Sequence, residues 1–172
     1  MTREAQIFVD NENKVSDRLG EIKTGDEIET LSQSILKWMV ILEISTGKGI
    51  AANAGHEHPA IRRADGEFEL SVYRHSLALG VMEDVPFAEH EFKLNPGDTL
   101  FVYTDGVPEA TNAEDVQYGT DRMLALLNKY KNVPINDLLI KLRNDIDKFA
   151  GDTPQFDDIT MLSIKYKGSQ PD

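Results

Sequence analysis

Two amphipathic helical stretches followed by a strand constrain the fold of this chain most. In the stretch "YGTDRMLALLNKY", apolar residues recur at the spacing of one helix face, at Met123, Leu124, Leu127 and Tyr130. The range 134–151 repeats the pattern more regularly, with Pro134 in the first turn and Gly151 after the end, as helix termini prefer. We therefore expect two helices that each pack an apolar stripe against other elements.

Ahead of these helices, apolar runs separated by turn signals predict antiparallel strands. "TGKG" and Ala-Asp-Gly-Glu each lie between two such runs, and "NPGD" leads into the strand "TLFVYT". Hairpins, two helices and a returning strand predict an α+β fold in which helices cover one face of an antiparallel sheet. The expected strands are 38–45, 50–55, 59–63, 67–73, 90–94, 99–104 and 159–166.

Composition excludes several classes of function. The 172 residues suit one domain or a large part of one, and 30 acids against 18 bases give a formal net charge of −12. This charge argues against nucleic-acid and anionic-membrane partners, because both need clustered lysine and arginine. The chain has no cysteine, which excludes disulfides and thiolate chemistry. No apolar run reaches transmembrane length and no signal peptide is evident, so we expect a cytoplasmic protein.

Acidic residues adjoin two of the predicted strands. "LFVYTDGVPEATN" carries an apolar strand into Asp105 and Gly106, and Asp157 and Asp158 directly precede the last strand. Each pair taken alone is typical of an ordinary turn. Strand-terminal carboxylates can, however, converge at one edge of a sheet, where they offer the oxygen ligands that Mg²⁺ and Mn²⁺ prefer. Backbone beside a ligating aspartate can also contribute a carbonyl to a metal if no side chain obstructs it, and Gly106 is suited to that close approach.

Taken in order, "AANAGHEHP", "LFVYTDGVPEATN" and "FDDITMLSIK" resemble the signatures of PPM-type metal-dependent serine/threonine phosphatases. The likeness is greatest to the SpoIIE-like and RsbU-like bacterial branch that regulates sigma factors, and it covers roughly residues 36–166. It implies an α-β-β-α sandwich with a binuclear Mn²⁺ or Mg²⁺ centre. Asp105 and Asp157 would be metal ligands with Gly106 beside them, and Asp158 would support the loop.

The resemblance also implies a substrate and further site residues. Asn53 and His56 fall on the "NAGH" motif, either as a hydrogen-bonding corner or in contact with substrate or metal-bound water. The substrate class is phosphoserine or phosphothreonine in a protein, and an anti-anti-sigma factor is the leading candidate. Two bridged cations would supply an activated water, so no covalent nucleophile from the protein is needed.

The N-terminal part departs from the family pattern. The family's early Asp-Gly block is missing, and the nearest substitute is Asp26 in "TGDEIET". We expect an atypical polar segment at 1–34, with a helix at roughly 12–22, the C-terminal part of a phosphatase domain at 35–167, and a tail at 168–172. Such a shortened sandwich exposes an apolar face unless it forms a homodimer, exchanges strands, or covers the face with its N-terminal segment. The alternatives to an active phosphatase are a non-catalytic binding module of the same fold, or a fragment of a longer protein.

Overall fold

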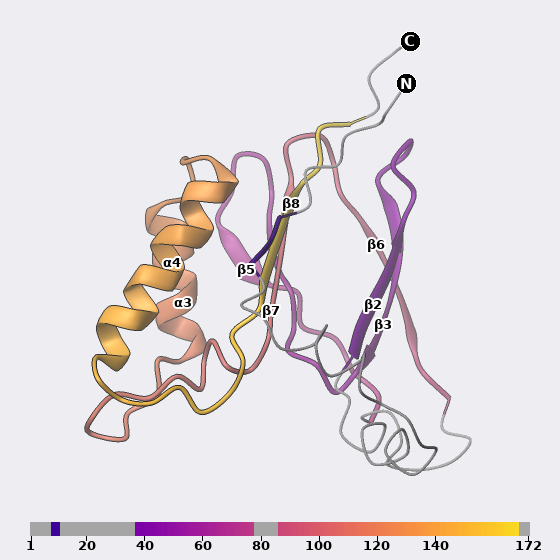
Figure 1. Cartoon of the computed structure of the whole chain (residues 1–172). Coiled ribbons are helices and arrows are strands. Elements are labelled where there is room, and N and C mark those ends of the chain that lie inside the picture. The colour runs from indigo at the N-terminus through magenta and orange to yellow at the C-terminus, as the bar shows by residue number, and fades with distance from the viewer. Residues whose placement is uncertain (1–7, 11–36, 78–85, 169–172) are drawn as a thin grey trace, which may run out of the picture.

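The computed structural model describes residues 8–10, 37–77 and 86–168 (Figure 1). Short strands dominate the first part of the described chain, and two helices precede the last strand. In chain order the elements are β1 (Phe8–Asp10), β2 (Lys37–Leu42), β3 (Lys48–Ala54), β4 (Ala60–Arg62), β5 (Phe68–Leu70), β6 (Glu89–Lys93), β7 (Thr99–Tyr103), α3 (Thr120–Lys129), α4 (Ile135–Ala150) and β8 (Met161–Lys165).

The strands form two antiparallel sheets. One sheet has five strands in the order β1-β8-β7-β4-β5, and the other has three strands in the order β2-β3-β6. In the larger sheet Phe101 of β7 lies opposite both Ala60 of β4 and Ser163 of β8, so β7 is central. This arrangement confirms the predicted hairpins and the predicted returning strand.

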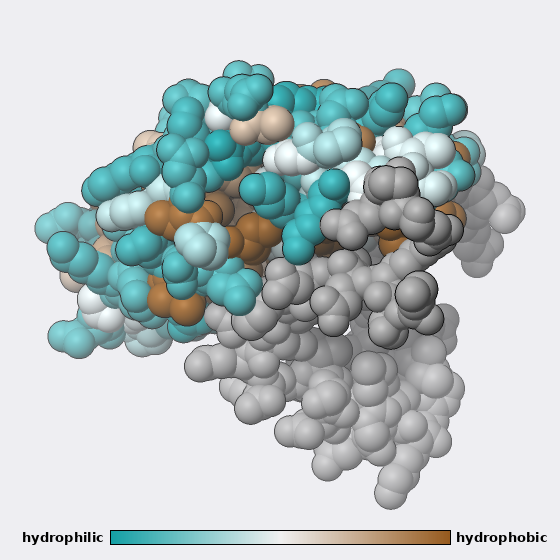
Figure 2. Space-filling view, turned by 90° about the horizontal axis from the view of Figure 1, so that it is seen from above, coloured by the Kyte–Doolittle hydropathy of each residue, from teal (hydrophilic) through white to brown (hydrophobic). Residues whose placement is uncertain are grey.

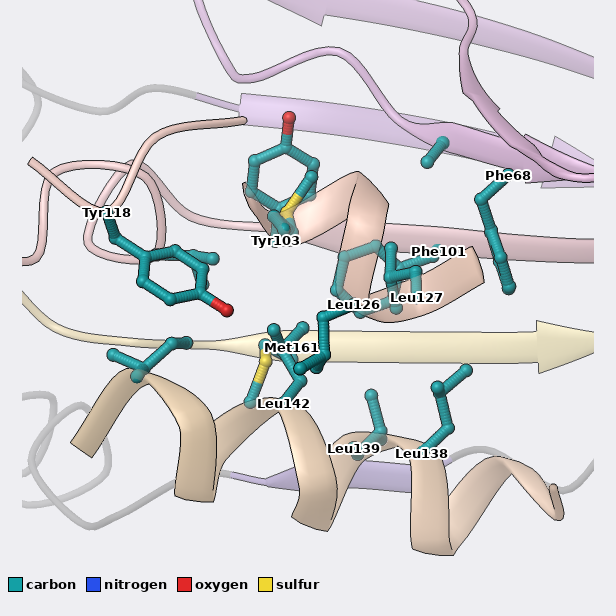
Figure 3. Close-up of a cluster of buried hydrophobic side chains, with 14 residues drawn as sticks. Phe68, Phe101, Tyr103, Tyr118, Leu126, Leu127, Leu138, Leu139, Leu142 and Met161 are labelled. Carbon is teal, nitrogen blue, oxygen red and sulfur yellow. The ribbon is translucent and has the colours of Figure 1, made fainter. Parts of the chain in front are cut away.

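Helices α3 and α4 cover one face of the five-stranded sheet (Figure 1). Pro134 and Gly151 cap α4 as the sequence predicted, and Gly151 adopts φ +59°. The apolar stripes of both helices meet side chains from β5, β7 and β8 in one buried cluster (Figure 3). Its members include Phe68, Phe101, Tyr103, Met123, Leu127, Leu139, Leu142, Ile146 and Met161.

A second apolar cluster joins the two sheets. Leu94, Leu100 and Tyr166 form its buried centre, and Trp38 and Phe92 pack against them from the smaller sheet. Helices, large sheet and small sheet therefore form three successive layers, in agreement with the predicted α+β sandwich. A second helical layer would lie on the outer face of β2-β3-β6, and the described part of the chain contains no helix there.

That outer face carries exposed apolar side chains. Ile41 lies opposite Ile50, and Met39 lies opposite Ala52, so these four residues form one patch on the strands. Met39 is 65% exposed, Ile41 73% and Ile50 44%. The described residues seen from above are mostly hydrophilic, with several hydrophobic patches among them (Figure 2). No helix within the described ranges is both long enough and apolar enough to cross a membrane.

Two details differ from what the sequence predicted, and one predicted helix lies outside the described residues. Strand β2 ends at Leu42 rather than 45, because Glu43 begins a turn in which Gly47 N–H donates to the Glu43 carbonyl at 2.8 Å and Gly47 takes φ +73°. Strand β1, which the sequence left unassigned, pairs with β8. The helix expected at 12–22 lies outside the described residues.

Candidate functional site

The structure brings the end of β7 next to the loop that precedes β8. Tyr103 and Met161 are the last paired residues of these strands, and one step further the Thr104 N–H donates to the Thr160 carbonyl at 3.0 Å. The residues that follow β7 and those that precede β8 therefore leave the sheet side by side. Asp105 and Asp157, far apart in the sequence, lie on these adjacent segments.

Thr104 fastens the two segments through its side chain. Its hydroxyl Oγ1 donates to the Asp158 carbonyl at 2.7 Å and accepts the Thr160 N–H at 2.9 Å. Both backbone groups lie outside the regular ladder, so the hydroxyl satisfies a donor and an acceptor that would otherwise depend on water. The loop carrying Asp157 and Asp158 is thereby held against the end of β7.

Gly106 explains how closely the two segments can approach. A Cβ at this position would lie 2.6 Å from the Asp158 carbonyl oxygen and 3.0 Å from the Asp157 carbonyl oxygen. Gly106 does not adopt a positive φ, so close packing of the backbone is what requires glycine here. The predicted juxtaposition of the "TDG" and "DD" motifs is present in the structure.

The three carboxylates at this edge differ in what they already bind. The Asp105 side chain accepts the N–H of Gly106 at 3.0 Å, and the Asp157 side chain accepts the N–H of Asp158 at 2.6 Å. The side chain of Gln155 donates to the Asp157 carbonyl at 2.6 Å. Asp157 and Asp158 are exposed and Asp105 is half-buried, so their remaining oxygens are accessible to a ligand.

Asn53 and His56 form a hydrogen-bonded corner after β3. The fully buried Asn53 side chain donates from Nδ2 to the His56 carbonyl at 3.0 Å and accepts the His56 N–H at Oδ1 at 2.8 Å. This geometry corresponds to the corner that the sequence offered as one of two roles. Because β4 pairs with β7 directly afterwards, the corner lies toward the same end of β7 as Asp105.

Tyr103 connects this corner to the helical core. Its hydroxyl is buried without a hydrogen-bond partner in the described part of the chain, and it points away from α4 (Figure 3). Burial, reinforced by the negative charge of Glu57, raises the pKa of Tyr103 to about 12. The phenol therefore stays neutral and contributes no charge to this end of the sheet.

Three histidines and a tyrosine pack together near the Asn53–His56 corner and form a histidine cluster of His58, Tyr73, His75 and His90. The ring of His58 lies edge-on to that of Tyr73, with 5.3 Å between the ring centroids, and the centroids of His58 and His75 are 5.6 Å apart. The centroids of Tyr73 and His90 are 4.2 Å apart. These residues come from the β3–β4 loop, the segment after β5, and β6, so the cluster ties the smaller sheet to the larger one. Burial, and then the charge of His75, lowers the pKa of His58 despite the opposing effect of Glu57.

Comparison with known proteins identifies the family. A family model described as "Stage II sporulation protein E (SpoIIE)" matches residues 14–167. This chain belongs to that family. The predicted relationship to PPM-type phosphatases of the SpoIIE-like and RsbU-like branch is therefore confirmed.

Solved structures of phosphatase domains share the fold. The SiaA-PP2C domain of Pseudomonas aeruginosa is 20% identical with a TM-score of 0.63, covering 82% of this chain and 58% of that one. The RsbU and RsbW domains of Rv1364c from Mycobacterium tuberculosis are 21% identical with a TM-score of 0.65, covering 92% of this chain and 44% of that one. The Mn-presoaked phosphatase domain of the cell fate determinant SpoIIE from Bacillus subtilis is 15% identical with a TM-score of 0.63, covering 91% and 65%.

A curated relative is much longer than this chain. Protein IcfG of Synechocystis sp. (strain ATCC 27184 / PCC 6803 / Kazusa) is 29% identical over 129 residues, which are 72% of this chain and 19% of the relative. The chain therefore spans about a fifth of that protein. It also spans less than two thirds of each of the three solved chains.

PP2C phosphatases are a metal-dependent family, and the described residues fit one side of a Mg²⁺ or Mn²⁺ site. The carboxylates of Asp105 and Asp157 provide hard oxygen donors, and the carbonyl of Gly106, in the same pair of segments, is a further candidate donor. Within residues 8–10, 37–77 and 86–168, no three acidic or histidine side chains lie close enough together to hold a metal ion. A complete site therefore needs a donor from elsewhere, and Asp26, the substitute suggested by the sequence, lies outside the described residues.

Several residues at this edge escaped the sequence reasoning. Thr104 lies in the "TDG" motif and Glu57 in the stretch "AANAGHEHP", but the sequence analysis assigned neither a role, and only their neighbours in space provide one. Phe156 carried a signal that could have been noticed, since it is an aromatic residue in a polar turn directly before Asp157. The structure leaves its side chain 90% exposed.

Proposed function

We propose that this chain is part of a metal-dependent protein phosphatase that acts on phosphoserine or phosphothreonine. The observation that carries the proposal is the contact of Gly106 with the backbone of Asp157 and Asp158, which joins the two acidic motifs at one sheet edge. Family membership supports the same reading. In this proposal residues 35–167 form the phosphatase part, 1–34 an atypical N-terminal segment, and 168–172 a tail.

The chain's own residues would hold and position the metal. Asp105 and Asp157 would ligate Mn²⁺ or Mg²⁺ through carboxylate oxygens, with the Gly106 carbonyl as a further donor. When bound, such cations neutralise phosphoryl charge and lower the pKa of a coordinated water. Thr104 and Asp158 keep the Asp157 loop in register with β7.

Asn53 and His56 would support the site from the neighbouring corner. Asn53 is fully engaged by the backbone of His56, so its effect on the reaction would be to fix the position of the loop. Asp26 remains our candidate for the additional carboxylate ligand.

The proposed substrate is a phosphorylated regulatory protein. The named neighbours include the phosphatase domain of SpoIIE and an RsbU domain, which supports a role in sigma-factor partner switching with an anti-anti-sigma factor as substrate. The formal net charge of −12 disfavours nucleic acid and anionic membrane as partners. A cytoplasmic location for the reaction remains part of this proposal.

A second candidate function follows from the donor count. Because no three acidic or histidine side chains gather within the described ranges, a non-catalytic module of this fold is the alternative. Assembly bears on both candidates. The exposed Met39, Ile41 and Ile50 on β2 and β3 support a homodimer or a strand-exchanged form that covers this face and could supply the missing ligand.

The test compares the parent chain with Asp105→Asn and with Asp65→Asn, an exposed acid in the β4–β5 turn, as the matched control. Hydrolysis of p-nitrophenyl phosphate and of a phosphoserine peptide is followed with and without Mn²⁺, and Mn²⁺ binding is measured by calorimetry. We expect Mn²⁺-dependent turnover in the parent and in Asp65→Asn, and loss of turnover and of metal binding in Asp105→Asn. Mn²⁺ binding without turnover in the parent would instead support the non-catalytic module.

A further inference from the structure

Phe156 is presented to solvent at the edge of the candidate site. Its side chain is 90% exposed, more than Met39, Ile41 or Val72, which are also exposed and apolar. Leaving a phenylalanine ring in water forgoes a large burial free energy, so full exposure beside charged residues is unusual. The neighbour in sequence is Asp157, whose Cα lies about 3.8 Å from that of Phe156 across one trans peptide.

The backbone that carries the ring is fixed on both sides. Gln155 donates its side-chain N–H to the Asp157 carbonyl at 2.6 Å, which bridges across Phe156. Thr104 holds the Asp158 carbonyl at 2.7 Å. When the ring contacts a partner, its side-chain torsions must still be ordered, but the loop backbone is already held, and this makes Phe156 suited to act as an anchor.

Basic side chains are missing from both segments that border the site. The segment 104–118 contains four acids and the segment 151–160 contains three, and neither contains lysine or arginine. In the proposed function, cations held by Asp105 and Asp157 bind the phosphate group, and the other acids of these segments add no attraction for it. Contacts that select among phosphoproteins must therefore come from side chains other than bases. Phe156 is the exposed large apolar side chain nearest in sequence to the candidate ligands.

We propose that Phe156 is a docking residue that contacts an apolar side chain flanking the phosphorylated serine or threonine of a protein substrate. This inference rests on the proposed phosphatase function and adds a substrate preference to it. The short distance from Phe156 to Asp157 limits the contacted residue to within about two positions of the phosphorylated one. Phe156 would thus favour substrates with apolar residues at those positions.

The experiment uses two phosphoserine peptides, Ala-Arg-Leu-pSer-Leu-Arg-Ala and the same sequence with both leucines replaced by serine. We measure kcat and KM for each peptide with Mn²⁺ for the parent, for Phe156→Ala and for Phe156→Leu. Ile140→Ala is the matched control, because Ile140 is 58% exposed on α4 and remote in sequence from both acidic motifs. The parent should have a higher kcat/KM for the leucine peptide than for the serine peptide. In Phe156→Ala the ratio of the two kcat/KM values should fall about tenfold, mainly because KM for the leucine peptide rises, in line with burial of one aromatic ring.

The outcomes separate docking from a structural role and from failure of the proposed function. Phe156→Leu should retain part of the preference, and Ile140→Ala all of it. Equal losses on both peptides in Phe156→Ala, or no preference in the parent, would overturn the proposal. If the parent shows no turnover, the proposed function fails, and fluorescence anisotropy of the labelled peptides then decides. Tighter binding of the leucine peptide by the parent, lost in Phe156→Ala, supports docking at Phe156. Equal binding of the two peptides by the parent overturns the proposal.

Discussion

The close approach at Gly106 makes a quantitative prediction for Gly106→Ala. The added Cβ would lie 2.6 Å from the carbonyl oxygen of Asp158, 2.9 Å from its carbonyl carbon and 3.0 Å from the carbonyl oxygen of Asp157. All three are backbone atoms, so no side-chain rotation relieves the clash. Overpacking of this kind costs about 1–3 kcal/mol. Because backbone atoms cannot rotate away, we expect the upper half of this range, about 2–3 kcal/mol. Reduced entropy of the unfolded chain returns about 0.4–1 kcal/mol, which leaves a net loss of about 1–2.5 kcal/mol.

Urea unfolding monitored by far-UV circular dichroism measures this loss. Gly66→Ala is the matched control, because the nearest atom to its added Cβ is 3.5 Å away and Gly66 does not adopt a positive φ. We expect the control to be at least as stable as the parent. Amide exchange of Thr160 should also accelerate in Gly106→Ala, since displacement of the Asp157 loop weakens its bond to Thr104. A Gly106→Ala protein within about 0.5 kcal/mol of the parent would refute the steric argument.

Two further predictions concern pH and buried polar groups. The buried Asp98 carboxylate accepts the Ala64 and Asn95 N–H groups and pairs with Arg63, and these bonds outweigh the effect of burial and lower the pKa of Asp98. Urea unfolding should show that Asp98→Ala is less stable than the parent by about 3 kcal/mol. As pH falls through the lowered pKa of Asp98, the parent should lose the stability that the ionised carboxylate contributes, and the variant should not. A variant as stable as the parent would contradict this role of Asp98. The lowered pKa of His58 means that the unfolded state binds the proton more readily, so parent stability should fall as pH drops below about 6.5. His58→Gln should show a shallower decline over the same range, and parallel pH profiles would argue against the cluster.

The sequence predicted those parts of the fold that local pattern determines. Helix α4 could be bounded from Pro134 and Gly151 because backbone restriction at one end and a left-handed residue at the other act locally. The approach of the segment carrying Asp105 to the loop carrying Asp157 could be predicted because both adjoin strands and the motif order resembles a known family. The helix boundary is thus specified locally, whereas the meeting of the two segments was predicted from a motif order that runs along most of the chain.

Features that depend on distant segments could not be predicted where no motif or strand pattern marks them. Strand β1 has three residues and no periodicity, so only its contact with β8 defines it. The histidine cluster arises because the segment after β5 crosses to the smaller sheet, where Ser76 bridges to Ala54. Nothing within one segment encodes that crossing. The role of Thr104 was hidden for the same reason, since its two partners lie more than fifty positions away in sequence.

The position of β8 between β7 and β1 has a consequence for synthesis on the ribosome. Until β8 emerges from the ribosome, one edge of β7 is unpaired and β7 lacks one of its two neighbouring strands. The Asp157 segment directly precedes β8, so the candidate site cannot assemble until translation has passed about residue 165. A nascent or prematurely terminated chain would consequently present an open sheet edge without the candidate site, which makes it a target for chaperones and proteases.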